Sequence, residues 1–121
     1  MRVYTSYYAK MSRDLHEMVP VTISTSVPSW FPWITEDLRI LVPGWDLVMG
    51  IKEGRITQEQ YTERYLSKLA GINKEEVWKE LNKISAQNGN RDIVLLCYEK
   101  RGDFCHRHLV ADWLGGVEEY E

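Results

Sequence analysis

The chain has little of what marks several large classes of protein. Its 121 residues hold two cysteines, and its net charge is only −3. No apolar run approaches the roughly 20 residues of a membrane helix, and the first residues lack the apolar stretch of a signal peptide. The weak net charge gives no electrostatic case for nucleic acid or a membrane surface as a partner. We therefore expect a cytoplasmic protein.

Common cofactor and metal motifs are also missing from the sequence. It contains no P-loop and no G-x-G-x-x-G pattern, and it lacks the paired C-x2-C spacing of many zinc sites. A phosphatase-type loop needs Arg six residues after Cys, but Asp103 and Ala111 stand six residues after Cys97 and Cys105. In a reducing compartment the default for these cysteines is two free thiols. We expect no cofactor and no metal.

What is present indicates a folded α/β protein. A hydrophobic share of 44% and five tryptophans are typical of globular chains, and the length fits one domain over residues 1–121. The segment 93–98 is apolar on both faces, which predicts a strand covered on both sides and paired with parallel neighbours. Further predicted strands are 3–8 and 19–27. Predicted helices cover 45–53 and the segments that follow Thr57, Asn73 and Cys105. This pattern favours a three-layer α/β domain with a mainly parallel sheet flanked by helices.

Two segments give weaker signals. Residues 28–34, PSWFPWI, combine two prolines with three aromatic residues, so we expect an irregular loop. Its aromatic side chains either seal the core or cover a ligand. The acidic residues 118–121 at the end of the chain are expected to fray.

The stretch from Arg91 to Gly116 concentrates the reactive side chains. Ligands of open α/β sheets bind beyond the carboxyl ends of the strands, and the predicted strand 93–98 is followed by a helix that begins near Cys105. The first N–H groups of a helix attract anions. Arg107 and His106 or His108 add donors, so the turn is a candidate anion site. Alternatively, Arg107 pairs on the surface with a carboxylate of Glu99, Asp103 or Asp112.

Cys105 has a second possible role. A thiol at a helix start beside His and Arg tends to have a lowered pKa, which suits a nucleophile with His106 or His108 as acid or base. Glu99 is a further candidate for the general base. Alternatively, Cys105 is a small buried residue, and Cys97, on its strand, is expected to be core. A metal site that uses both cysteines and His108 is disfavoured, because we expect His106 to point elsewhere.

The segment VLLCYEKRGDFCHRHLVADWL resembles the C-terminal signature of the domain-of-unknown-function 488 family. VYTSYYAK, VPVTIS with PSWF, and PGWDLVMGIKEGRITQEQYTERYLSKL are similar to the same family, so the resemblance covers most of the chain. It implies an α/β fold without implying an activity. It directs attention to Cys97, Glu99, Cys105, His106 and Arg107, and it adds as pocket candidates Thr5, Ser6, Tyr7 and Ser24.

These observations lead to three hypotheses about function. The first is binding of a compact anionic ligand such as a nucleotide or sugar phosphate, held by Arg107 and the helix start, with Trp30, Phe31 or Trp33 stacked on a base. The second is a thiol-dependent enzyme with Cys105 as nucleophile. The third is a non-catalytic protein that sequesters a ligand or binds another protein through its tryptophan-rich loop.

Overall fold

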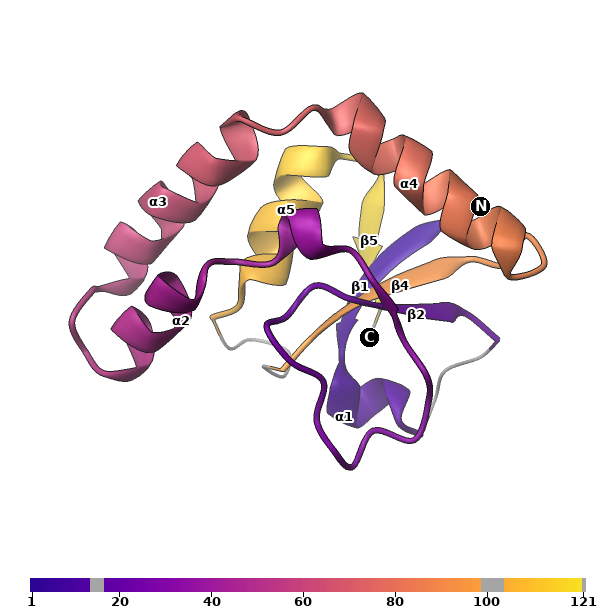
Figure 1. Ribbon diagram of the computed structural model, residues 1–121, viewed down its shortest axis with the longest axis horizontal. Coiled ribbons are helices and arrows are strands. Elements are labelled where there is room, and N and C mark those ends of the chain that lie inside the picture. Colours follow the sequence, from indigo (N-terminus) through magenta and orange to yellow (C-terminus); the bar gives the residue numbers. More distant parts are fainter. Residues whose placement is uncertain (14–16, 99–103, 121) are drawn as a thin grey trace.

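The fold is built around one parallel β-sheet. A computed structural model describes residues 1–13, 17–98 and 104–120, and five strands in it form a sheet in the order β3-β2-β4-β1-β5 (Figure 1). Each of the strand pairs is parallel. The strands are β1 (Val3–Tyr7), β2 (Val19–Thr22), β3 (Glu36–Asp37), β4 (Ile93–Cys97) and β5 (Val117–Glu119).

The central strand β4 explains why the sheet has two covered faces. All five of its residues are buried, and it pairs with β1 on one side and β2 on the other. Side chains alternate between the faces of a strand. Ile93 and Leu95 therefore join one hydrophobic cluster, while Val94 and Leu96 join another on the opposite face. This observation confirms the sequence prediction of a strand covered on both sides.

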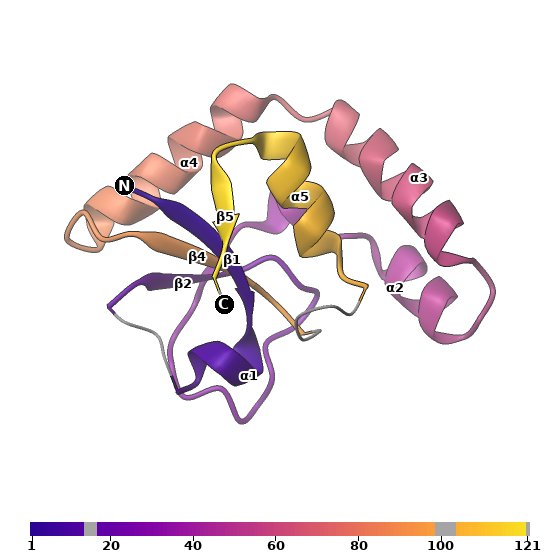
Figure 2. The same cartoon turned by 180° about the vertical axis from the view of Figure 1, so that it is seen from behind.

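Helices α3, α4 and α5 supply much of the larger cluster, which lies on one face of the sheet (Figure 2). Helix α3 begins with a capping box in which the Thr57 hydroxyl accepts from the Gln60 backbone N–H and the Gln60 side chain accepts from the Thr57 N–H. Each exchange satisfies a donor that a helix start leaves without a partner. The helices of the chain are α1 (Tyr8–Met11), α2 (Trp45–Lys52), α3 (Gln58–Ala70), α4 (Lys74–Gln87) and α5 (His106–Leu114), with a 3-10 turn at Arg39–Leu41.

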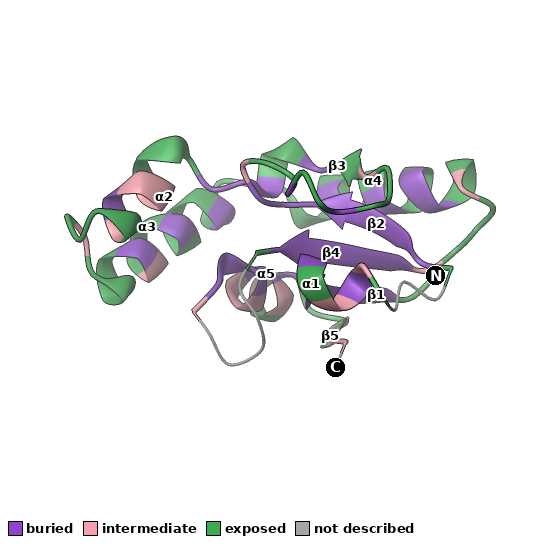
Figure 3. Cartoon of the chain, turned by 90° about the horizontal axis from the view of Figure 1, so that it is seen from below, coloured by how far each residue is buried: buried purple, intermediate pink, exposed green. Residues whose placement is uncertain are grey.

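The opposite face of the sheet has a thinner cover. Tyr8 and Met11 of α1 pack there with Phe31 against Val94 and Leu96. Seen from below, α1 lies across the sheet on this face (Figure 3). Together the two covers make the three-layer α/β arrangement that the sequence predicts. No helix in the described part of the chain has both the length and the apolar character needed to span a membrane.

The structure corrects the expectation that the end of the chain frays. Residues Val117–Glu119 form the edge strand β5, paired with β1. The Glu119 carboxylate accepts a hydrogen bond of 2.8 Å from the Thr5 hydroxyl and pairs with the buried Arg107. An acidic segment is held here because a buried guanidinium needs a carboxylate.

The aromatic loop 28–34 divides between two roles. Phe31 is 8% exposed and seals the core, whereas Trp30 and Trp33 are 57% and 47% exposed. The sequence shows the cluster of aromatic residues, but their orientations depend on how the loop crosses the α1 face.

A pair of leucines tests this description of the core. Leu95 is 0% exposed, and Leu66 on α3 is 41% exposed. Leu95→Ala should lower the free energy of unfolding by about 2–5 kcal/mol, the usual loss for a buried leucine, and Leu66→Ala by under ~1 kcal/mol. Urea denaturation of both variants measures the difference. Equal losses would contradict the central position of β4.

Candidate functional site: the Cys97–Cys105–His106 cluster

The site forms where β4 ends and α5 begins. Cys97 is the last residue of β4, and Cys105 is the N-cap of α5. Their sulfur atoms are joined in a disulfide, and the two residues are 2% and 4% exposed. The expectation of two free thiols is therefore wrong, whereas the burial of Cys97 confirms the expectation that it is a core residue. A spacing of eight residues does not by itself reveal this contact between the strand end and the helix start.

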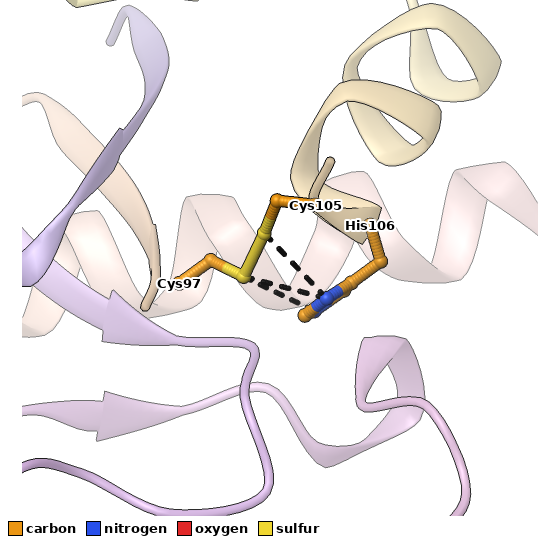
Figure 4. A group of neighbouring side chains, drawn as sticks. All are labelled: Cys97, Cys105 and His106. Atoms are coloured by element: carbon orange, nitrogen blue, oxygen red, sulfur yellow. Dashed lines mark hydrogen bonds between the residues drawn. A yellow bond between two sulfur atoms is a disulfide. The ribbon is translucent and has the colours of Figure 1, made fainter. Parts of the chain in front are cut away.

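His106 lies directly against both sulfur atoms (Figure 4). Its Nδ1 is 3.4 Å from the Cys97 sulfur and 3.9 Å from the Cys105 sulfur. Its Nε2 is 2.6 Å from the carbonyl oxygen of Ile23, which follows β2. The expectation that His106 points away from the cysteines is thus wrong. His106, the first residue of α5, points into the protein, where its Nε2 reaches the Ile23 carbonyl just beyond the end of β2.

The Ile23 carbonyl determines the protonation of the His106 ring. A carbonyl oxygen only accepts hydrogen bonds, so Nε2 must carry the hydrogen and donate it. In a neutral imidazole the other nitrogen then has a lone pair. That nitrogen is Nδ1, which is the ring nitrogen nearer to the Cys97 sulfur, at 3.4 Å against 4.0 Å for Nε2.

Burial keeps this ring neutral. His106 is 6% exposed, and its pKa is lowered from 6.5 to about 4, mainly by desolvation. The hydrogen bond to Ile23 works in the opposite direction, and repulsion from the charges of Arg107 and Lys68 contributes to the lowering. The Tyr65 ring packs edge-on against the imidazole, with the ring centroids 5.5 Å apart, and so helps to fix its orientation.

A cavity of about 340 Å³ opens beside the cluster. This volume lies at the small end of the range for small-molecule sites. Three groups of residues line it: the site residues Cys97, Cys105 and His106; the hydroxyl-bearing segment Ser24, Thr25 and Ser26; and a mainly apolar and aromatic wall of Pro43, Trp45, Val48, Ile51, Lys52, Tyr61, Tyr98 and Phe104.

Arg107 and His108 face a different side of the helix start. The Arg107 side chain is 0% exposed and lies 3.3 Å from a Glu119 carboxylate oxygen. Its guanidinium also stacks over the Tyr7 ring at 5.5 Å. Nδ1 of His108 is 3.6 Å from the same carboxylate. The structure therefore gathers Arg107 and His108 around Glu119, with Tyr7 against Arg107, and none of the three lines the cavity. Of the carboxylates that the sequence suggested as partners, Glu99 and Asp103 lie outside the described residues.

The remaining sequence-predicted residues are dispersed. Ser24 lines the cavity, and its hydroxyl pairs with the Tyr8 hydroxyl at 2.7 Å. The Ser6 hydroxyl donates to the Tyr120 carbonyl at 3.3 Å, so Ser6 belongs to the β5 side. Trp30 is exposed and does not line the cavity. Glu99 lies outside the described residues.

Sequence reasoning missed three parts of the site. The acceptor for His106 is the main-chain carbonyl of Ile23, which has no side-chain signature. Tyr65 lies in the segment after Thr57 that the sequence predicts only as a helix, and Trp45 and Lys52, which line another side of the cavity, lie in the predicted helix 45–53. A histidine directly after a cysteine at a predicted helix start is the signal that could have suggested a shared site.

The fold and the site together define a small parallel α/β protein with a Cys-His-Arg helix start. The chain belongs to the DUF488 family, because a family model described as the active DUF488-N3 subclade, DUF488-N3a, matches residues 6–117. The match confirms the resemblance seen in the sequence. No similar curated protein was found, and no similar solved structure was found.

The lowered pKa of His106 predicts a pH-dependent stability. Between pH 6.5 and about 4, the histidine takes up a proton in the unfolded chain but stays neutral in the fold. The unfolded state then binds more protons, so the free energy of unfolding should fall as the pH falls through this window, by up to about 3 kcal/mol.

Urea denaturation of the wild type and the His106→Gln variant from pH 7 to pH 4 measures this contribution. The difference between the two should shrink toward low pH, whereas His108→Gln, at a half-exposed histidine, should follow the wild type. A difference between the wild type and His106→Gln that stays constant with pH would contradict the buried neutral ring.

Proposed function

We propose that the protein carries out thiol–disulfide exchange on a small substrate in the cavity, with Cys105 as the nucleophile. One observation carries this proposal: the bonded sulfur atoms of Cys97 and Cys105 belong to residues that line a cavity of ligand size. A disulfide that serves only to stabilise a fold does not need such a cavity beside it.

The reaction needs only these two sulfur atoms and a substrate disulfide. In the reduced protein, the Cys105 thiolate attacks one sulfur of the substrate, forms a mixed disulfide and releases the first substrate thiolate. The Cys97 thiolate then attacks the Cys105 sulfur, releases the second thiolate and forms the Cys97–Cys105 bond. The substrate gains two electrons and the protein loses two. The reverse sequence oxidises a small dithiol or a pair of thiols.

The positions of the side chains suggest the division of roles. Cys105 is the N-cap of α5, where the helix dipole favours a thiolate. The nearer sulfur to Nδ1 of His106 is that of Cys97, so Nδ1 is a base within reach of the resolving thiol. Glu99, which lies between the cysteines in the sequence and outside the described residues, remains a candidate for proton transfer.

Single-cysteine variants test these roles. Cys97→Ser leaves the nucleophile without its resolving partner, so reduced Cys97→Ser should accumulate a mixed disulfide with oxidised glutathione. Cys105→Ser should form this adduct at least ~10-fold more slowly, because its remaining thiol, Cys97, does not lie at a helix start, where the helix dipole favours the thiolate. Mass spectrometry over time measures both rates. A faster adduct on Cys105→Ser would reverse the roles, and no adduct on either variant would refute the proposal.

A second candidate keeps the expected anionic ligand and places it in the same cavity. Lys52 supplies a positive charge among the described residues of the lining, beside the hydroxyl-bearing segment Ser24, Thr25 and Ser26 and near the rings of Trp45 and Tyr61. Hydroxyl groups and a cation suit a phosphate or carboxylate, and the aromatic rings suit a flat organic group. In this version Lys52 replaces Arg107 as the cation, since Glu119 already pairs with Arg107.

Two lysine variants test the anionic ligand. Lys52→Ala should weaken binding of nucleoside monophosphates or inorganic phosphate by about 5–10-fold, the loss of roughly one charge-assisted contact. Lys83→Ala, at an exposed position on α4, should leave it unchanged. NMR titration of both variants measures the affinities. Equal affinities, or no shift at cavity residues on the wild type, would exclude this ligand class.

A further inference from the structure

The same three side chains have the donor set of a metal centre. One ligand atom from each of Cys97, Cys105 and His106 lies within 4.8 Å of the other two, and all three residues are buried. Two thiolates and one imidazole are a combination that zinc prefers. The proximity of these three ligand atoms supports a metal site independently of the proposed disulfide exchange.

The distances to the imidazole already suit a bound ion. A tetrahedral zinc ion with bonds of ~2.3 Å to sulfur and ~2.0 Å to nitrogen separates its sulfur and nitrogen ligands by about 3.5 Å. Nδ1 of His106 lies 3.4 Å from one sulfur and 3.9 Å from the other. Opening the disulfide would free the two sulfur atoms to take up the ion between them and the imidazole.

The His106 ring is also prepared for coordination. The Ile23 carbonyl accepts the hydrogen of Nε2 at 2.6 Å, so Nδ1, the ring nitrogen nearer to the Cys97 sulfur, keeps its lone pair. Ligating histidines commonly donate their other N–H to a carbonyl or carboxylate, which fixes the ring and its tautomer. Tyr65 packs against the same ring and limits its rotation.

We propose that the reduced protein binds one zinc ion through the thiolates of Cys97 and Cys105 and Nδ1 of His106. Three protein ligands leave a coordination position for water or a small molecule, as in catalytic zinc sites, and all three residues line the cavity. Reduction of the disulfide adds two electrons and two protons, and zinc binding then releases both thiol protons. In the oxidised protein the two sulfur atoms are joined in the disulfide. That form therefore does not bind the ion.

Cobalt titration tests the site directly. The protein is reduced with a phosphine, freed of the reductant without exposure to air and titrated with Co²⁺. One equivalent should produce thiolate-to-cobalt charge-transfer bands, and one equivalent of Zn²⁺ should abolish them. The oxidised wild type, which has the same residues, should give no bands.

The variants separate this site from adventitious binding. Cys97→Ser and His106→Gln should each lower the Zn²⁺ affinity at least ~100-fold, beyond the ~10–100-fold that loss of a surrounding hydrogen bond causes. His108→Gln should bind like the wild type. No cobalt–thiolate band from the reduced wild type would overturn the metal site, as would equal Zn²⁺ affinities for His106→Gln and His108→Gln. Either result would leave the exchange with oxidised glutathione untouched, since that reaction needs no ion.

Discussion

The hydrogen bond between Nε2 of His106 and the carbonyl of Ile23 organises the site. It joins the start of α5 to the end of β2 across most of the chain, and it places the hydrogen of the imidazole on the nitrogen farther from the sulfur atoms. The proposed proton transfer from Cys97 and the proposed zinc site both depend on the lone pair that Nδ1 then keeps. Without this contact, the histidine would be a buried base with no fixed direction.

The start of α5 separates two kinds of polar chemistry. On one side, the disulfide and the neutral imidazole line a cavity whose other wall is mainly apolar and aromatic. On the other, Arg107 is enclosed by Tyr7 and Glu119, and the edge strand β5 is held against β1. The arginine therefore contributes to the fold by binding the end of the chain, while the residues before it contribute to the site. Adjacent positions on a helix face about 100° apart, which allows this division within three residues.

The sequence predicted the features that local chemistry controls. The strand Ile93–Cys97, the capping box at Thr57 and the helix after Cys105 follow from periodicity and helix-start signals, and the family resemblance directed attention to the segment in which the cluster forms. The disulfide, the orientation of His106 and the partner of Arg107 depend on contacts between distant elements. Ile23 acts through its main chain, so no side-chain pattern could have indicated it. Glu119 was misjudged because an acidic terminal segment ordinarily remains in solvent.

The tautomer of His106 is the most direct test of this account. Long-range ¹H–¹⁵N NMR at neutral pH distinguishes a protonated ring nitrogen from one that carries a lone pair. We predict a hydrogen on Nε2 and none on Nδ1, in both the oxidised and the reduced, metal-free protein. A hydrogen on Nδ1, or a doubly protonated ring at neutral pH, would show that the nitrogen nearer to the Cys97 sulfur has no lone pair and would contradict the account.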